Sequence, residues 1–285
     1  MTNDQLNAEI SHRATIGDHA ELARLLSLLQ QASGVVNAAA LQNAAKNGHV
    51  ECVNLLISSS KIMLHDPKAL LDAAYNGHAE CVKLLIPVSN PKADESLSFR
   101  LAASGGHLEC LKLLLPVSDP KANRLALYWA AYHGHPECVE LLLTLHYPEG
   151  MKLDTLLGTV CNGHAECARL LIPFFNPAAN NSAALCYAMR QGHAECFKLL
   201  IPVSDLKHLK SDDIQLAIFK GHMSVLEIAV VHEPSLVNLI RPLLDPSNET
   251  HAQLLLAMLA ISERESLSAT INSPKNSTPN PAPRL

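Results

Sequence analysis

A histidine and a cysteine three residues apart recur along this chain, and both side chains could bind a metal ion. The pairs are His49 and Cys52, His78 and Cys81, His107 and Cys110, His135 and Cys138, His164 and Cys167, and His193 and Cys196. A structural zinc site needs four ligands around one ion. Each pair supplies two, and equivalent positions on neighbouring packed helices are roughly 8–10 Å apart. The pattern therefore favours a structural role, in which the histidine caps or hydrogen-bonds a turn and the cysteine fills a core position. A metal- or redox-responsive protein is the alternative.

Catalysis by a cysteine nucleophile would need a neighbouring base and a third group that orients it. Cys161 and Cys186 are the two cysteines outside the repeated position. Neither has a distinctive base nearby, since His164 has equivalents in the other copies. We therefore expect no catalytic residues and no enzyme. Disulfides between copies would need Cα atoms within about 7 Å, so we expect free thiols in a reducing cytosol.

The histidines belong to a longer repeat that begins with glycine. Gly-His occurs at 48, 77, 106, 134, 163, 192 and 221, at intervals of 29, 29, 28, 29, 29 and 29 residues. A fixed period of this length predicts one supersecondary unit copied in tandem, each copy burying its apolar face on its neighbours.

Each copy contains the pattern of two helices. The residue seven before the glycine is always apolar, and small residues, mostly alanine, stand four and three before it, as in Leu70, Ala73 and Ala74. These offsets lie on one face of a helix, which the glycine then ends in a left-handed conformation. Apolar residues after the glycine repeat at helical spacing until a proline, such as Pro87 or Pro116, ends the second helix.

The repeated string Leu-x-x-Ala-Ala-x-x-Gly-His-x-Glu-(Val/Cys)-Val-x-Leu-Leu-Leu resembles the helical half of an ankyrin repeat. The resemblance covers residues 36–232 in seven copies, and a weaker copy at 14–26 indicates an N-terminal capping repeat in residues 1–35. It implies an all-α, ankyrin-like helical solenoid of helix–turn–helix repeats that acts as a protein-interaction scaffold. The usual period of the family is about 33 residues, and its Thr-Pro-Leu-His start is missing here. We therefore expect the β-hairpin fingers to be shortened or absent.

The two ends of the array carry further expectations. Residues 233–267 are predicted to form C-terminal capping helices, and residues 268–285, rich in Ser, Asn and Pro, a disordered tail. The connector Ile-Pro-Val-Ser-Asp-Pro-Lys resembles those of bacterial ankyrin proteins, including effectors delivered into host cells. The resemblance implies a cytoplasmic protein or one secreted into a host-cell cytosol, and it leaves open whether the tail is an export signal or an unselected end.

Composition excludes several partners. The net charge is −5 and the lysines are scattered, so no basic stripe for nucleic acid is expected. No apolar run approaches the roughly 18 residues of a membrane span, and the N-terminus lacks a signal-peptide pattern. We expect a monomer without cofactors or metal that binds a protein partner.

The residues that vary between copies are the candidates for binding that partner. They stand two, five and six before the glycine, on the helix that lines the concave surface of ankyrin-like stacks. Tyrosine, tryptophan and arginine, the types enriched at binding hot spots, gather in the middle copies. The candidate partner-binding residues are Tyr75, Arg100, Tyr128, Trp129, Tyr132, His133, Tyr187 and Arg190. The alternative for Trp129 is that it packs over the neighbouring repeat.

Overall fold

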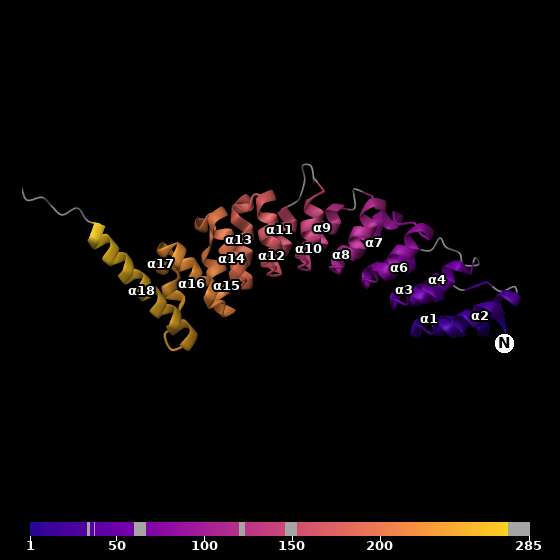
Figure 1. Cartoon of the computed structure of the whole chain (residues 1–285). Helices are drawn as coiled ribbons and strands as arrows, with labels where there is room; N and C mark the ends of the chain where they lie inside the picture. Colours follow the sequence, from indigo (N-terminus) through magenta and orange to yellow (C-terminus); the bar gives the residue numbers. More distant parts are fainter. Residues whose placement is uncertain (33–34, 37, 60–66, 120–122, 146–152, 273–285) are drawn as a thin grey trace, which may run out of the picture. The chain divides into compact units, whose positions relative to one another are not determined.

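The chain forms two compact units, Met1–Asn176 and Pro177–Leu285, each built from stacked helix pairs (Figure 1). The structure is a computed structural model that describes residues 1–32, 35–36, 38–59, 67–119, 123–145 and 153–272. All regular structure within these ranges is helical, which confirms the predicted all-α class. The array predicted as one block over residues 36–232 is divided between the two units at Asn176.

The first unit contains six helix pairs in chain order. Its helices are α1 (Asn3–Ile16), α2 (His19–Gln31), α3 (Ala38–Lys46), α4 (Val50–Ser58), α5 (Lys68–Tyr75), α6 (Ala79–Leu85), α7 (Ala93–Ser104), α8 (Leu108–Leu114), α9 (Asn123–Tyr132), α10 (Pro136–Leu143), α11 (Leu153–Cys161) and α12 (Ala165–Leu171). The odd-numbered helices pack on one another in one layer and the even-numbered helices in a second layer (Figure 1). Residues 3–31 of the segment 1–35 form a helix pair, and its role as a capping repeat stays a prediction.

The second unit contains two further pairs and a C-terminal region. Its α-helices are α13 (Ala179–Gln191), α14 (Ala194–Leu200), α15 (Ser211–Phe219), α16 (Met223–His232), α17 (Val237–Ile240) and α18 (Glu249–Asn272). In this unit α13 packs on α15, α14 on α16, and α16 on α18.

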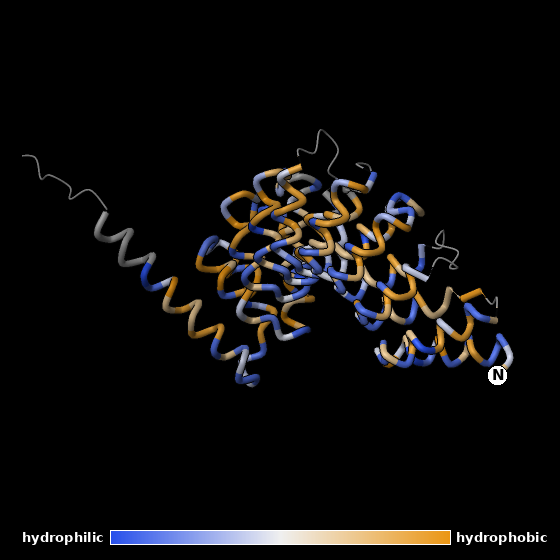
Figure 2. Tube along the Cα trace, turned by 45° about the vertical axis from the view of Figure 1, so that its right-hand side comes forward, coloured by the Kyte–Doolittle hydropathy of each residue, from blue (hydrophilic) through white to orange (hydrophobic). Residues whose placement is uncertain are grey.

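Small and aliphatic side chains at the predicted positions form the core. Leu70, Ala73 and Ala74 in α5 are almost wholly buried, as are Cys81 and Leu85 in α6, and the pattern recurs from pair to pair. Apolar and polar residues alternate along the helices of the stack in Figure 2, as expected for helices that bury one face. Because alanine is small, successive helices of the odd-numbered layer can approach closely.

The second helix of a pair ends in a tight turn where the sequence places proline. After α6, α8, α12 and α14 the chain enters short 3₁₀ turns at Ile86–Val88, Leu115–Val117, Ile172–Phe174 and Ile201–Val203. These described connectors contain turns in place of β-hairpins, in agreement with the expected loss of the fingers. The connectors that include residues 60–66, 120–122 and 146–152 lie partly outside the described residues.

Two buried serines tie the start of a first helix to the next connector. Ser96 Oγ accepts a hydrogen bond from the backbone N–H of Asp119 at 2.8 Å, and Ser182 Oγ accepts one from Asp205 at 3.0 Å. Both serines have left-handed backbone conformations, with φ of 57° and 56°. Such values are unfavourable for residues other than glycine, so the buried hydrogen bonds help to hold these turns in place.

Histidines of the Gly-His pairs bond to the preceding repeat. His78 Nε2 donates to the backbone carbonyl of Lys46 at 3.0 Å, and His107 Nε2 donates to that of Tyr75 at 2.8 Å. His49 and His135 make the same contact, each with the residue two before the preceding glycine. These histidines begin the second helices without a side-chain cap bond. Of the two expected roles, capping or hydrogen bonding, the described histidines therefore show the hydrogen bond, which they make to the turn of the preceding repeat.

The glycine leaves space for this imidazole ring. Gly77 has φ 78°, a left-handed conformation, and a Cβ built on it would lie 2.5 Å from His107 Nδ1. The glycine is therefore required twice: its backbone adopts the left-handed turn, and its missing side chain leaves room for the histidine ring of the next repeat. In the second unit His222 hydrogen-bonds the Arg190 backbone, and burial together with the positive charge of Lys220 lowers the pKa of the His222 imidazole. A lowered pKa keeps this ring neutral at pH 7.

The C-terminal region covers the last helix pair only in part. Leu254 and Met258 of α18 are buried where this helix packs on α16, as a cap should. The segment before it is broken into the 3₁₀ turn Pro234–Leu236, the short α17 and the 3₁₀ turn Arg241–Leu243. Helix α18 continues to Asn272, beyond residue 267, where the tail was expected to begin. The rest of the predicted tail, residues 273–285, lies outside the described residues.

Candidate partner-binding surface

Six of the eight candidate binding residues lie in the first unit, on three successive helices of the odd-numbered layer. Tyr75 ends α5, Arg100 lies in α7, and the remaining four, Tyr128, Trp129, Tyr132 and His133, lie in α9 or directly after it. Because α5 packs on α7 and α7 on α9, these residues belong to neighbouring repeats. Tyr187 and Arg190 lie on α13 in the second unit.

The outer side of α9 carries an apolar, aromatic stripe. It consists of Leu125, Tyr128, Trp129, Tyr132 and His133, which we name the α9 stripe, and their spacing places them on one helix face. Leu125 and Trp129 are 42% and 38% exposed. The opposite face of the same helix is buried through alanine and leucine. Helix α9 is therefore apolar on both sides although one side faces solvent, which is typical of an interaction surface.

The rings of the α9 stripe pack against one another. Tyr128 and Tyr132 are stacked with ring centroids 5.7 Å apart, and Trp129 stacks on His133 at the same separation. Trp129 also meets Tyr128 and Tyr132 edge-on, at 5.2 and 5.8 Å. Aromatic pairs favour these arrangements. The mutual packing restricts the side-chain rotamers, so less conformational entropy is lost when a partner binds.

A glycine in the next repeat makes room for two of these rings. Gly158 of α11 occupies the position that holds Trp129 in α9, five before the Gly-His pair. A Cβ on Gly158 would lie 3.1 Å from Tyr132 Cδ2 and 3.6 Å from Tyr128 Cε2. Tyr128 and Tyr132 therefore pack over the following repeat. Packing over the neighbouring repeat was the alternative expected for Trp129. Trp129 itself remains partly exposed.

Tyr75 and Arg100, on the neighbouring helices, differ in exposure and in hydrogen bonding. The Tyr75 side chain is 57% exposed while its backbone carbonyl accepts the bond from His107. Arg100 is half-buried and its Nη2 donates to the Asp94 carbonyl at 3.0 Å. Arg100 Nε is buried and has no hydrogen-bond acceptor among the described residues. Tyr75 is thus the more accessible of the two.

In the second unit, Arg190 is held by its own neighbours. Its Nε donates to Asp213, a carboxylate only 1% exposed, and its guanidinium lies 5.8 Å from the centre of the Tyr187 ring. The bond to Asp213 raises the pKa of Arg190. Asp213 also accepts from the backbone N–H of Lys210 at 3.0 Å. Arg190 therefore neutralises a buried carboxylate and supports Tyr187 through a cation–π contact.

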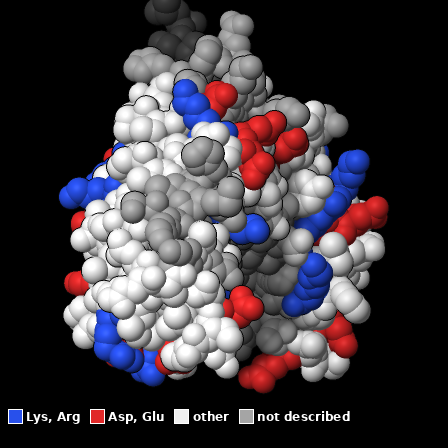
Figure 3. Space-filling view, turned by 90° about the vertical axis from the view of Figure 1, so that its right-hand side faces the viewer, with Lys and Arg blue, Asp and Glu red and all other residues white. Residues whose placement is uncertain are grey.

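Basic and acidic side chains are interspersed on the face drawn in Figure 3. Elsewhere in the described chain, salt bridges join charges within one helix turn, such as Lys112 with Glu109 and Lys198 with Glu195. Surface pairs of this kind contribute little to stability. The α9 stripe itself contains no lysine or arginine.

The repeated cysteines are buried core residues. The cysteines of the described ranges are not joined in disulfides, and the six in the repeated position are buried. Burial raises the pKa of Cys110 to about 11, with the same value for Cys81, Cys138 and Cys196. A thiol kept protonated is a poor nucleophile and a poor metal ligand. Within the described ranges, no cluster of three or more His, Cys, Asp or Glu residues is placed to hold a metal ion.

The raised thiol pKa values predict a loss of stability at alkaline pH. The unfolded thiols ionise near pH 9 and the buried ones near pH 11, so the unfolded state releases protons first and stability falls as the pH rises between these values. At pH 10 the wild-type chain should lose about 1 kcal/mol more than a Cys110→Val variant, relative to pH 7.5. Urea unfolding with reductant at both pH values measures this difference, and equal losses would contradict the prediction.

Comparison with known proteins identifies the repeat. Helix pairs that stack through glycine turns and carry variable residues on one layer define a helical repeat protein. The family pattern described as ankyrin repeats (3 copies) matches residues 10–97 and again residues 70–155. The chain belongs to the ankyrin-repeat family. Comparison with curated proteins found no match.

Solved structures agree with this assignment. The crystal structure of the human ASB11 ankyrin repeat domain is 22% identical, covers 62% of this chain and 89% of its own, and superposes with a TM-score of 0.52. At this identity the likeness concerns the fold. No helix in the described part of the chain combines the length and apolar character needed to span a membrane.

Proposed function

We propose that this chain is a non-catalytic scaffold that binds a partner protein through the α9 stripe, with Tyr75 and Arg100 at its edge. Ankyrin repeats are generally protein–protein interaction modules. The observation that carries the proposal is that α9 exposes packed aromatic rings on one side while its other side fills the core. Large aromatic residues of this kind contribute most of the energy at protein interfaces.

The chemistry of the stripe favours a protein over a nucleic acid. Single-stranded nucleic acids also stack on aromatic rings, but they require a basic groove along their phosphates. The α9 stripe has no basic residue other than His133, and the net charge of the chain is −5. An apolar or aromatic face of a partner protein suits this surface best.

Tyr187 extends the proposal to the second unit. Its ring is 37% exposed and is supported by the Arg190 guanidinium. We assign Tyr187 a direct contact with a partner, and Arg190 a positioning role because its charge is already paired with Asp213. The metal- or redox-responsive role is the less favoured alternative, since His78 and His107 bond to neighbouring repeats and the six repeated thiols are buried. The host-delivered effector role stays a prediction from resemblance, which a translocation assay in infected cells would test.

Photo-crosslinking tests the binding surface directly. A photoreactive phenylalanine analogue placed at Tyr75 or at Trp129 should capture the same protein from a lysate, identified by mass spectrometry. The matched control places the analogue at Phe174, an exposed aromatic residue of the same unit (54%) outside the proposed surface. Equal capture from Phe174, or different proteins from Tyr75 and Trp129, would argue against the α9 stripe.

A further inference from the structure

Six of the glycines that end a first helix receive a histidine ring from the repeat that follows. A Cβ built on Gly17, Gly48, Gly77, Gly106, Gly134 or Gly192 would lie 2.3–2.6 Å from Nδ1 of that histidine. In four of these cases the Nε2 bond to the carbonyl two residues before the glycine is between 2.8 and 3.0 Å. The left-handed glycine and this carbonyl together form a socket for imidazole.

The last socket of the array is empty. Gly221 has φ 77°, like the other glycines, but no atom lies within 4 Å of a Cβ built on it. The equivalent carbonyl belongs to Phe219, whose side chain is 87% exposed. A groove of about 550 Å³ opens here, lined by Phe219, Lys220 and Gly221 together with Leu243 and His251.

Helix α18 leaves this socket open because it packs on the other layer. Helix α18 packs on α16, whereas the socket lies at the end of α15. His251 lines the groove, but its Nδ1 accepts a hydrogen bond from the backbone N–H of Asp245 at 3.1 Å. Its ring is therefore engaged elsewhere and does not lie within 4 Å of the Gly221 position.

We propose that the Gly221 socket binds the histidine of a Gly-His helix turn carried by another protein, as a continuation of the inter-repeat interface. A neutral imidazole fits because its Nε2–H donates to the Phe219 carbonyl while its ring occupies the space that glycine leaves. An ankyrin-type repeat on a partner supplies this histidine together with a helix that packs on the exposed end of α15. This site lies on the second unit and is independent of the α9 stripe.

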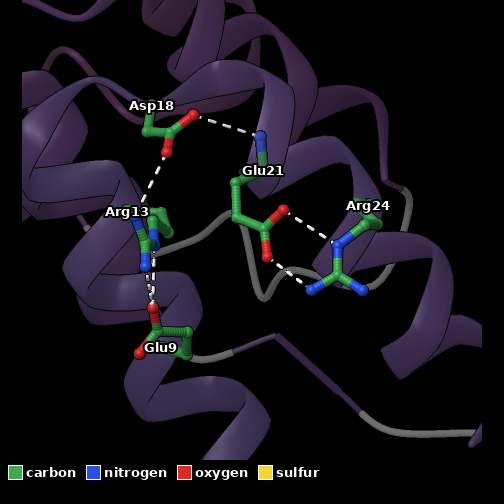
Figure 4. Close-up of polar contacts among 5 residues, drawn as sticks. All are labelled: Glu9, Arg13, Asp18, Glu21 and Arg24. Carbon is green, nitrogen blue, oxygen red and sulfur yellow. Dashed lines mark hydrogen bonds and ion pairs between the residues drawn. The ribbon is translucent and has the colours of Figure 1, made fainter.

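A second copy of this chain does not offer the required group at its first repeat. There Asp18 follows Gly17, in the place where later copies have histidine. Its carboxylate binds Arg13 Nη1 at 3.2 Å and accepts from the Glu21 backbone N–H at 3.1 Å, beside the Arg13–Glu9 and Arg24–Glu21 pairs (Figure 4). A carboxylate facing the Phe219 carbonyl would bring two acceptors together without a proton between them. Head-to-tail stacking of identical chains is therefore disfavoured.

NMR titration of the full ¹⁵N-labelled chain tests the socket. The probe is a synthetic peptide of residues 68–86, the helix pair whose His78 occupies the Gly48 socket within this chain. Shifts should concentrate at Phe219, Lys220 and Gly221, and a probe with His78→Ala should bind at least about tenfold more weakly. A Gly221→Ala chain should also lose at least about tenfold in affinity, because its Cβ would occupy the ring position.

The outcomes separate the proposal from its alternatives. Gly221→Ala has space for its methyl group in the free chain, so a normal spectrum away from the socket will confirm that the variant folds. Absence of peptide binding at millimolar concentration, equal affinity for the His78→Ala probe, or equal affinity of the Gly221→Ala chain would each overturn the proposal. Concentration-dependent shifts at Gly221 without peptide would identify a second copy as the occupant and would also overturn it.

Discussion

Gly77→Ala should lower the free energy of unfolding by about 3–5 kcal/mol, a large effect for a single methyl group. The left-handed backbone at Gly77 costs roughly 1–2 kcal/mol for a residue with a Cβ. The added carbon would also lie 2.5 Å from His107 Nδ1. The ring must then shift, which strains the packing and lengthens its 2.8 Å bond to the Tyr75 carbonyl.

Gly221→Ala is the matched control for this experiment. The φ angle of Gly221, 77°, is almost the same as the 78° of Gly77, but no atom lies within 4 Å of the added carbon. Only the backbone cost of about 1–2 kcal/mol should therefore remain. Urea unfolding followed by circular dichroism compares the two variants. Equal losses at both glycines would show that the histidine ring imposes no steric requirement.

A double-mutant cycle with His107→Ala isolates the contact between glycine and ring. Removing the ring frees the space that the new methyl group needs, so Gly77→Ala should cost about 2–3 kcal/mol less in the His107→Ala background than in the wild-type chain. Strict additivity of the two single changes would contradict the proposed fit.

Replacing Trp129 and Tyr132 by alanine should weaken binding of the crosslinked partner by about 100-fold or more. Hot-spot aromatic residues each contribute about 2 kcal/mol or more to protein association. The ring centroids of Trp129 and Tyr132 are 5.8 Å apart, so the two rings form one contact surface. The loss should appear mainly as faster dissociation. Surface plasmon resonance with the purified partner measures the affinity and both rate constants.

Two controls keep this result interpretable. Phe174→Ala removes an exposed aromatic side chain from the same unit and should leave affinity unchanged. The urea midpoint of the double variant reports whether loss of the Tyr132 contact with Gly158 destabilises the fold. An affinity within about threefold of wild type, with the fold intact, would exclude the α9 stripe as the main contact.

The helix pairs could be predicted because their pattern is local. Leu70, Ala73 and Ala74 recur at helical spacing and are buried in the structure, and the left-handed glycine after them follows from the position where the helix must end. The concave-face candidates also share positions in the repeat. That Tyr128 and Tyr132 would lean over Gly158, and that Leu125 would join the same exposed face, depends on how one repeat packs on the next.

The role of the histidines could not be predicted in full for the same reason. Their bonds join residues about one repeat apart, as His78 joins Lys46, so the position of each ring depends on the spacing between helix pairs. A motif read within one copy suggests only a turn. The empty socket at Gly221 likewise depends on where α18 packs, which no repeated residue encodes.

The amino-acid sequence alone determined the repeat, its two helices, its buried faces and the position of its glycine turns, because hydrophobic periodicity and backbone preference act within a few residues. The tertiary structure decided which groups are already engaged and which remain free. It bonds imidazoles of the Gly-His pairs to neighbouring repeats, buries the six repeated thiols, pairs Arg190 with Asp213 and leaves Trp129 of α9 and the Gly221 socket exposed. These outcomes depend on contacts between residues far apart in the chain, and those distances are set only when the helix pairs stack.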